Sequence, residues 1–335
     1  MHENQQKVGS TDTLRAAIIF YVLSVLLFPI SLLGYLIWVG KITLAKNKTG
    51  VSQTAQGPLF GRWFMHKLGI RPDEPSHRLL PLLPGIPALG IYLSAWPTLL
   101  AHRVSGYVPK SLRYPFTAEV APQYQVAARM TFLDAVVERH LADMDQFVIL
   151  GAGFDTRAFN LPKTSRIKAF EVDTPQTQAL KRALIAKAGI NTAGITFVAA
   201  NFEQEDWLER LVAAGFDIHK PTLFLWEGVI IYLDRAAVED TLRKVASTAK
   251  GSVIAFDYFT TESLESKAFY WRYARFGTNA AGEPLKFGVD STPPSRARLA
   301  ELLQSCGLTL GEQQTLGQET DGKRAWGGFT TALVR

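Results

Sequence analysis

Apolar residues form a long uninterrupted run near the start of the chain. No charged residue occurs between Arg15 and Lys41. The run Ala16–Val39 makes about 36 Å of helix, and the hydrocarbon core of a bilayer is about 30 Å thick. Tyr21, Tyr35 and Trp38 lie toward its ends, where amphipathic aromatic side chains favour the interface. The pattern predicts a transmembrane helix within an N-terminal segment, residues 1–45, which Pro29 kinks but does not end.

A second uncharged stretch, Leu79–Ala101, is interrupted by prolines at positions 81, 84, 87 and 97. Four prolines oppose one straight spanning helix, because each removes a backbone donor. If this stretch crossed the bilayer, the basic residues of 41–78 would lie on the far side of it. We therefore expect residues 46–118 to be membrane-associated and favour a shallow or re-entrant apolar element, or one that covers the catalytic domain, over a second span, which stays open.

From about residue 125 short apolar runs alternate with amphipathic stretches, which is typical of an α/β domain over 119–335. The fold class expected is a doubly wound, Rossmann-like α/β sheet. Strands are predicted at 147–151, 167–172, 195–199, 222–226, 252–257 and 327–334, with a weaker one near 308–314. Helices are predicted at 175–188, 204–214, 235–249, about 263–275 and 295–305.

The net charge of +6 divides unevenly along the chain. Residues 1–128 carry 12 Lys and Arg against 5 Asp and Glu, whereas residues 129–335 carry 24 against 25. Basic residues beside apolar segments favour an anionic lipid surface, so a lipid bilayer is an expected partner. A nucleic-acid partner is not expected, because the α/β domain has no basic surplus. The positive-inside rule places that domain in the cytosol. The single cysteine, Cys306, excludes an internal disulfide.

A glycine-rich turn follows the first predicted strand of the α/β domain. Gly151 and Gly153 let the backbone approach a ligand, and Glu171 and Asp173 end the next strand, where a carboxylate binds ribose hydroxyls. A third glycine is missing. Asp155 stands in the turn instead, where together with Thr156 it can cap a following helix but would repel a pyrophosphate. The turn therefore suits S-adenosylmethionine better than a nicotinamide dinucleotide.

Several motifs in order carry a family resemblance over about residues 120–335. They are LGAGFDTR (150–157), FEVDTP (170–175), LFLWEGVIIYL (223–233), Asp257-Tyr258 and Gly282-Glu-Pro-Leu-Lys-Phe-Gly288, with Arg129 before the first strand. Together they resemble the leucine carboxyl methyltransferase group of class I S-adenosylmethionine-dependent methyltransferases. The first 115 residues lie outside the resemblance.

The resemblance implies roles for individual positions. Arg129 would bind the carboxylate of the methionine moiety, and Glu227 would face the same end of the cofactor. Gly151 and Gly153 would line the cofactor, and Glu171 or, preferably, Asp173 would hold its ribose. Asn201-Phe202 stands where family members usually have Asp and an apolar residue contacting adenine.

The chemistry of methyl transfer requires mainly alignment of the acceptor with the methyl group. A carboxylate acceptor is already ionised at pH 7, whereas an alcohol or phenol would benefit from a general base. The candidate catalytic residues are Glu227, Tyr232 and Tyr258, and Asp257 also lies at a strand tip. No histidine or cysteine spacing indicates a metal site.

Three functions remain open on the sequence. The preferred one is a membrane-anchored O-methyltransferase acting on a carboxylate, or a hydroxyl, of a hydrophobic small molecule. A protein C-terminal carboxyl methyltransferase is its variant. The second is an NAD(P)-dependent oxidoreductase, which lacks the expected third glycine and a Tyr-x-x-x-Lys pair. The third is a non-catalytic membrane interaction protein that retains the fold.

Overall fold

The computed structural model describes residues 10–44, 52, 54–84, 87–162, 166–320 and 323–335. The chain forms two compact units, each with its own contacts. Unit 1 comprises residues 1–46 and 62–114, and unit 2 comprises residues 47–61 and 115–335. Helix α3 (Gln56–Lys67) begins in unit 2 and continues into unit 1.

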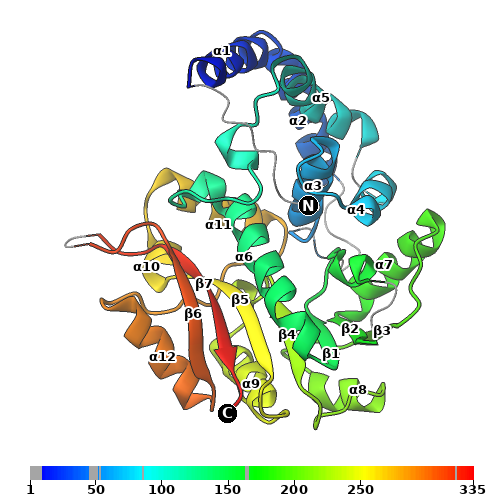
Figure 1. Ribbon diagram of the computed structural model, residues 1–335, viewed down its shortest axis with the longest axis vertical. Helices are drawn as coiled ribbons and strands as arrows, with labels where there is room; N and C mark the ends of the chain where they lie inside the picture. Colours follow the sequence, from blue (N-terminus) through cyan, green and yellow to red (C-terminus); the bar gives the residue numbers. More distant parts are fainter. Residues whose placement is uncertain (1–9, 45–51, 53, 85–86, 163–165, 321–322) are drawn as a thin grey trace. The chain divides into compact units, whose positions relative to one another are not determined.

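Unit 2 is built on a mixed seven-stranded sheet with the order β3-β2-β1-β4-β5-β7-β6 (Figure 1). Strands β1 to β5 are parallel, and β7 and β6 extend the sheet in antiparallel pairing. The strands are β1 (Gln146–Leu150), β2 (Lys168–Asp173), β3 (Ile195–Ala199), β4 (Thr222–Trp226), β5 (Val253–Phe259), β6 (Thr309–Leu316) and β7 (Gly327–Leu333). β1 and β4 are buried along their whole length, as parallel strands covered on both faces should be.

Helices cover both faces of this sheet. The longer helices of the unit are α6 (Gln125–His140), α7 (Pro175–Ala188), α8 (Trp207–Ala213), α9 (Arg235–Ala246), α11 (Phe269–Ala280) and α12 (Ser295–Ser305). Side chains of α8, α9 and α12 share one apolar core with Val148 and Phe224 of the central strands. On the other face α6 packs Phe132 against Phe329 of β7, and Lys181 of α7 reaches β2. The expected doubly wound α/β architecture is confirmed.

The predicted elements of unit 2 match the observed ones closely. The strands at 195–199 and 222–226 and the helices at 175–188 and 295–305 have the predicted bounds. α7 begins at Pro175, whose fixed φ suits a first helical turn, and ends where Gly189 adopts a left-handed φ of 63°. The helix predicted at about 263–275 is instead two, α10 (Thr261–Glu265) and α11.

The helix expected directly after the glycine turn is also absent. Among the described residues before β2, the 3-10 turn η5 (Arg157–Asn160) follows, and the Thr156 side chain makes no capping bond to it. Asp155 does accept a hydrogen bond from the backbone N–H of Arg157 at 2.7 Å. Asp155 and Thr156 therefore do not cap an α-helix in the described residues here, and Asp155 instead bonds to the backbone of the 3-10 turn.

The apolar run of unit 1 is broken. α1 (Ser10–Leu26) and α2 (Phe28–Leu44) meet at Leu27, and the pair Thr13–Leu26 and Phe28–Trp38 is bent by 57°. Pro29 lies in the first turn of α2, where it lacks a backbone donor for the preceding turn. Among the described helices none has by itself the length and hydropathy to cross a bilayer, and only this bent pair has them when taken together. The structure thus does not support the predicted single transmembrane helix.

The rest of unit 1 consists of α4 (Glu74–Leu79), the 3-10 turns η1 (Leu80–Leu82) and η2 (Lys110–Leu112), and α5 (Ala88–Ser105). The proline-interrupted stretch therefore forms a short turn and a separate helix, with Pro87 as the N-cap of α5 and Pro97 inside it. α5 packs against both α1 and α2. The contact with α2 is close, because a Cβ added at Gly34 would lie 2.3 Å from the backbone nitrogen of Ser94.

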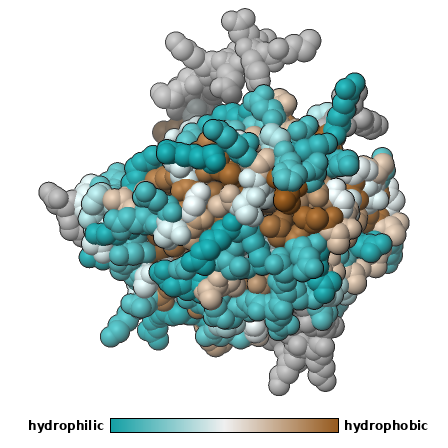
Figure 2. Space-filling view, turned by 90° about the horizontal axis from the view of Figure 1, so that it is seen from below, coloured by the Kyte–Doolittle hydropathy of each residue, from teal (hydrophilic) through white to brown (hydrophobic). Residues whose placement is uncertain are grey.

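Unit 1 leaves large apolar side chains exposed on α1 and α2. Val25 is 73% exposed and Leu26 70%, and Phe28 and Leu36 are each 57% exposed. Figure 2 shows a different kind of surface, a largely hydrophilic face in which hydrophobic residues appear only in patches. The exposed apolar side chains of α1 and α2 are typical of an interaction site.

Candidate active site

The glycine turn after β1 has the backbone conformation that its sequence requires. Gly151 and Gly153 have φ of 63° and 44°, which side chains other than glycine rarely adopt. A Cβ at Gly151 would lie 2.3 Å from Cγ2 of Val229. The N–H of Gly153 donates to Oδ2 of Asp173 at 2.5 Å. The turn and the tip of β2 are therefore held together through one carboxylate.

Asp173 and Glu171 lie two residues apart on β2 and point to the same face of the sheet. Asp173 is the last residue of β2, and it also accepts hydrogen bonds from the backbone and hydroxyl of Thr174 at 2.6 and 3.2 Å. A carboxylate has about four acceptor positions, so capacity remains for a ligand hydroxyl. Burial raises the pKa of Asp173, and the bonds from Gly153 and Thr174 oppose that effect. The position at the strand end favours Asp173 as the ribose ligand.

Glu171 lies inside the sheet, paired in register with Ile149 of β1. Burial raises its pKa to about 7, against the opposing charge of Lys181, whose Nζ is 2.6 Å from Oε2. Lys181 is itself only 1% exposed and donates to the backbone carbonyl of Asp155 at 2.8 Å. The Glu171–Lys181 pair therefore holds the glycine turn through the carbonyl oxygen of Asp155. Sequence reasoning missed Lys181.

Arg157, the last residue of the glycine-turn motif, holds three carboxylates. Its Nε donates to Asp134 at 2.7 Å, and its Nη1 donates to Asp155 and Glu227, each at 2.5 Å. Burial opposes its charge, but these three neighbours raise the pKa of Arg157 well above its ordinary value. Its presence in the motif was the only signal in the sequence, which did not indicate the partners.

Arg129 of α6 joins the same network. Its Nε lies 3.1 Å from Oε1 of Glu227, and its Nη1 donates to Asp257 at 3.1 Å. Asp257 also accepts a bond of 2.5 Å from the N–H of Gly228. The predicted residues Arg129, Glu227 and Asp257, from three separate segments, are thus brought together.

The described network contains more negative than positive charge. Six carboxylates, those of Asp134, Asp155, Glu171, Asp173, Glu227 and Asp257, face three cationic side chains, Arg129, Arg157 and Lys181. Buried charge is costly unless it is compensated. An excess of carboxylates at the ends of β1, β2, β4 and β5 therefore suits a ligand that carries positive charge.

A segment before α3 contributes to this part of unit 2. The N–H of Ser52 donates to the hydroxyl of Thr177 at 3.2 Å, and the N–H of Thr54 donates to Glu283 at 2.9 Å. Tyr232 hydrogen-bonds to the Thr54 side chain, and burial raises the pKa of Tyr232 to about 12. Sequence reasoning missed Thr54, because its segment lies outside the family resemblance, and it included Glu283 only as part of the motif 282–288 without a role.

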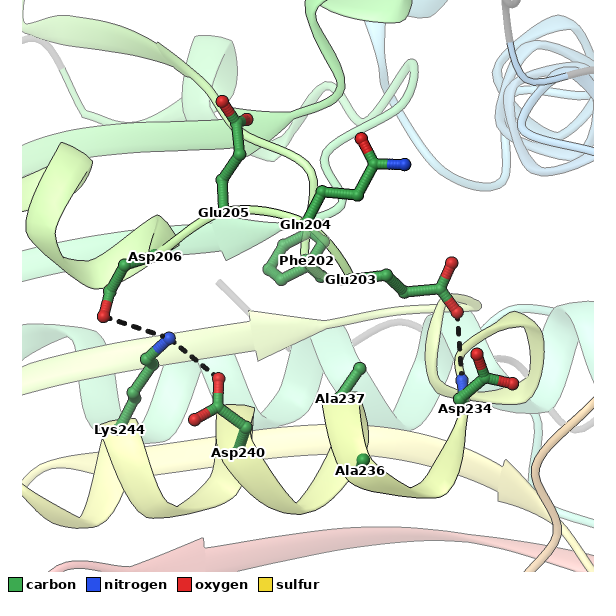
Figure 3. Close-up of a pocket in the computed structure, with 10 residues that line it drawn as sticks. All are labelled: Phe202, Glu203, Gln204, Glu205, Asp206, Asp234, Ala236, Ala237, Asp240 and Lys244. Atoms are coloured by element: carbon green, nitrogen blue, oxygen red, sulfur yellow. Dashed lines mark hydrogen bonds and ion pairs between the residues drawn. The ribbon is translucent and has the colours of Figure 1, made fainter.

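Asn201 and Phe202 follow β3 beside an open pocket of about 340 Å³ (Figure 3). The Asn201 side chain accepts a bond from the N–H of Glu203 at 2.9 Å, and the Phe202 ring packs against Trp207 at 6.1 Å. The pocket is lined by five acidic side chains, and Lys244 bridges two of them, Asp206 and Asp240. Asn201 and Phe202 lie directly after β3, as expected, and their contact with adenine stays a prediction.

Tyr258 lies apart from the cluster. Successive residues of a strand point to opposite faces, so Tyr258 faces away from the side on which Asp257 binds Arg129. Its hydroxyl accepts a bond of 2.7 Å from Gln313 of β6, and burial raises its pKa to about 12. The structure does not place Tyr258 where the sequence analysis expected it to position an acceptor.

Within the described residues, no group of three or more His, Cys, Asp or Glu side chains is arranged to hold a metal ion.

Comparison with known proteins gives a family match. Residues 113–246 match the family model of leucine carboxyl methyltransferase. A Mycobacterium avium protein, provisionally described as an S-adenosyl-L-methionine-dependent methyltransferase, is 33% identical over 204 residues, which are 55% of this chain and 66% of the relative. A Streptomyces coelicolor protein with the same provisional description is 37% identical over 137 residues, covering 40% and 48% of the two chains.

Solved structures are more distant. A DUF574 family protein from Streptomyces avermitilis aligns with 64% of this chain and 85% of its own, at 15% identity and a TM-score of 0.46. The match to the family model, in contrast, extends over the glycine turn, β2 and β4. The match over residues 113–246 and these relatives support a leucine carboxyl methyltransferase-like protein of the class I S-adenosylmethionine-dependent methyltransferases.

Proposed function

We propose that the chain is a membrane-associated O-methyltransferase that uses S-adenosylmethionine and acts on a carboxylate of a hydrophobic small molecule. The observation that carries the cofactor assignment is the surplus of carboxylates around the glycine turn. S-adenosylmethionine has a sulfonium and an ammonium group against one carboxylate. Its net positive charge complements the site, whereas the pyrophosphate of a nicotinamide dinucleotide would add negative charge to it.

The residues of the site fit the separate parts of this cofactor. Asp173 retains acceptor capacity at the end of β2 for ribose hydroxyls. Arg129 lies in another part of the network, beside Gly228, and would receive the methionine carboxylate. Glu227 would face the ammonium group. Arg157 orients Glu227 through their ion pair. Bound there, the cofactor supplies an electrophilic methyl group.

A carboxylate acceptor agrees with the state of Tyr232 and Asp257, the two candidate residues that could otherwise take a proton from an acceptor. The acceptor oxygen would form a bond to the methyl carbon as the sulfonium–carbon bond breaks and its electron pair stays on sulfur. Tyr232 keeps its proton at neutral pH, because burial raises its pKa to about 12. Asp257 is already engaged by Arg129 and Gly228. An ionised acceptor needs no proton removed, so the residues only have to hold it in line.

The hydrophobic acceptor and the bilayer are proposed from the surface of unit 1. Its helices α1 and α2 expose apolar side chains, and residues 1–128 carry the basic surplus of the chain. Both properties favour association with an anionic lipid surface. An enzyme held at a bilayer encounters lipid-soluble substrates at high local concentration. Methylation of a protein C-terminus is the alternative acceptor.

The test is calorimetric titration of S-adenosylmethionine and, separately, NADPH into the detergent-solubilised full chain. We expect micromolar binding of S-adenosylmethionine alone. Asp173→Asn retains an acceptor for Gly153 but loses the charge, and it should weaken binding by about 10- to 100-fold. Asp143→Asn, an exposed acid in the 3-10 turn Leu141–Asp143, is the matched control and should leave binding unchanged. Binding of NADPH, or of neither ligand, would refute the proposed function.

A further inference from the structure

Helix α11 of unit 2 is anchored to its domain by one aromatic residue. Trp271 is 6% exposed and packs edge-on against Phe259 of β5 at 5.0 Å, with Trp326 at 5.9 Å. Arg275 adds polar anchors, because its guanidinium donates to the carbonyl oxygens of Leu264 and Ser266. The helix is therefore held in place on its inner side.

The outer side of α11 presents an aromatic stripe. Phe269, Tyr273 and Phe276 are 83%, 56% and 73% exposed. Their spacing of four and three residues places them on one side of a helix. Phe269 and Tyr273 stack with their ring centroids 6.3 Å apart. Side chains of this size are normally buried, so a stripe of three requires an explanation.

The charges of α11 are all of one sign. Its sequence, FYWRYARFGTNA, contains Arg272 and Arg275 and no acidic residue, and Arg272 is exposed. Exposed Lys267 lies just before the helix. Aromatic rings beside arginine suit the interface of a bilayer, where rings enter the headgroup zone and cations meet phosphates.

α11 also borders the candidate active site. Trp271 packs against Phe259, which lies two residues after Asp257 on β5 and therefore on the same face of the sheet, where Asp257 binds Arg129. Arg129 belongs to the cofactor network. The inner side of the helix thus faces the site, while the stripe faces outward.

We propose that the outer side of α11, formed by Phe269, Tyr273 and Phe276, docks on the surface of an anionic phospholipid bilayer and opens the active site toward it. The inference rests on the proposed function, because a bilayer-facing entrance serves a lipid-soluble acceptor. The charge of the helix complements anionic lipid. Three aromatic side chains offer roughly 750 Å² at most, less than the about 800 Å² per partner of a typical protein interface.

Fluorescent labels on the full chain test this docking. Phe276→Cys, on a Cys306→Ala background, is labelled with an environment-sensitive fluorophore and mixed with phosphatidylcholine–phosphatidylglycerol vesicles. A second set of vesicles carries a nitroxide quencher on the acyl chains. Val25→Cys, at a 73% exposed position of unit 1, reports membrane association of the chain as a whole. Glu301→Cys, an exposed position on α12, is the control.

We expect the nitroxide lipids to reduce the Phe276 fluorescence at least twofold and to leave the Glu301 label unaffected. Quenching at Val25 but not at Phe276 would overturn the role of α11 and leave the membrane association of the proposed function intact. A Phe276 label that is shielded from aqueous iodide but not reached by lipid would mean that protein covers the stripe, and would also overturn it. No quenching at either position would refute membrane association itself, while S-adenosylmethionine titration of the same labelled proteins tests the methyltransferase assignment separately.

Discussion

At the scale of single residues, the guanidinium of Arg157 determines how the site's carboxylates are arranged. It binds Asp134 of α6, Asp155 of the glycine turn and Glu227 after β4. Without this cation the buried negative charges of these carboxylates would be uncompensated, which would destabilise the folded protein. Arg157 thereby links the cofactor turn to the residue expected to meet the cofactor's ammonium group.

We predict that Arg157→Met lowers the free energy of unfolding by about 3–5 kcal/mol. The matched control is Arg139→Met, which breaks the exposed pair of Arg139 with Glu312 and should cost less than about 1 kcal/mol. Urea unfolding followed by tryptophan fluorescence measures both. Equal effects of the two substitutions would show that the buried network does not stabilise unit 2.

At the scale of elements, unit 1 depends on the close approach of α2 and α5. Gly34 and Gly90 face each other there, and a Cβ at Gly90 would lie 3.0 Å from the carbonyl oxygen of Gly34. Two helix backbones approach this closely only when no side chain lies between them. The run of apolar residues indicated a helix here, but not that it would break at Leu27 and pack on another helix of the chain.

We predict that Gly34→Ala forces α2 away from α5 and destabilises unit 1 by about 1–3 kcal/mol, as overpacking does. Gly40→Ala lies on the same helix, and its Cβ would meet no atom within 4 Å. The control should be neutral or stabilising, since alanine favours a helix over glycine. Thermal unfolding in detergent, followed by circular dichroism, compares the two. A neutral Gly34→Ala variant would contradict the packing.

At the scale of the whole molecule, two units with separate contacts should respond differently to a ligand. S-adenosylmethionine at about 100 times its dissociation constant would stabilise the unit that binds it by about 2.7 kcal/mol. We predict two calorimetric transitions in the detergent-solubilised chain, of which only the transition of unit 2 moves upward with the cofactor. One transition that moves as a whole would instead indicate that the units unfold together.

Local patterns in the sequence were sufficient for most of unit 2. Strands such as Thr222–Trp226 read as continuous apolar runs because both of their faces are buried, and α7 is bounded by a proline and a glycine. The motifs also identified Arg129, Gly153 and Asp173. These signals depend on residues close together in the chain, where burial period and turn chemistry leave a direct trace.

The tertiary structure alone decided which charges meet and which apolar runs pack on each other. Lys181 reads as a surface residue of an amphipathic helix, yet it is buried against Glu171, and Tyr258 reads as a site residue, yet it faces the other side of the sheet. Thr54 reaches Tyr232 across more than half the chain. The sequence by itself determined most elements of unit 2, the family resemblance and the cofactor turn. Long-range partners depend on the crossing of strands and helices, which no local pattern encodes.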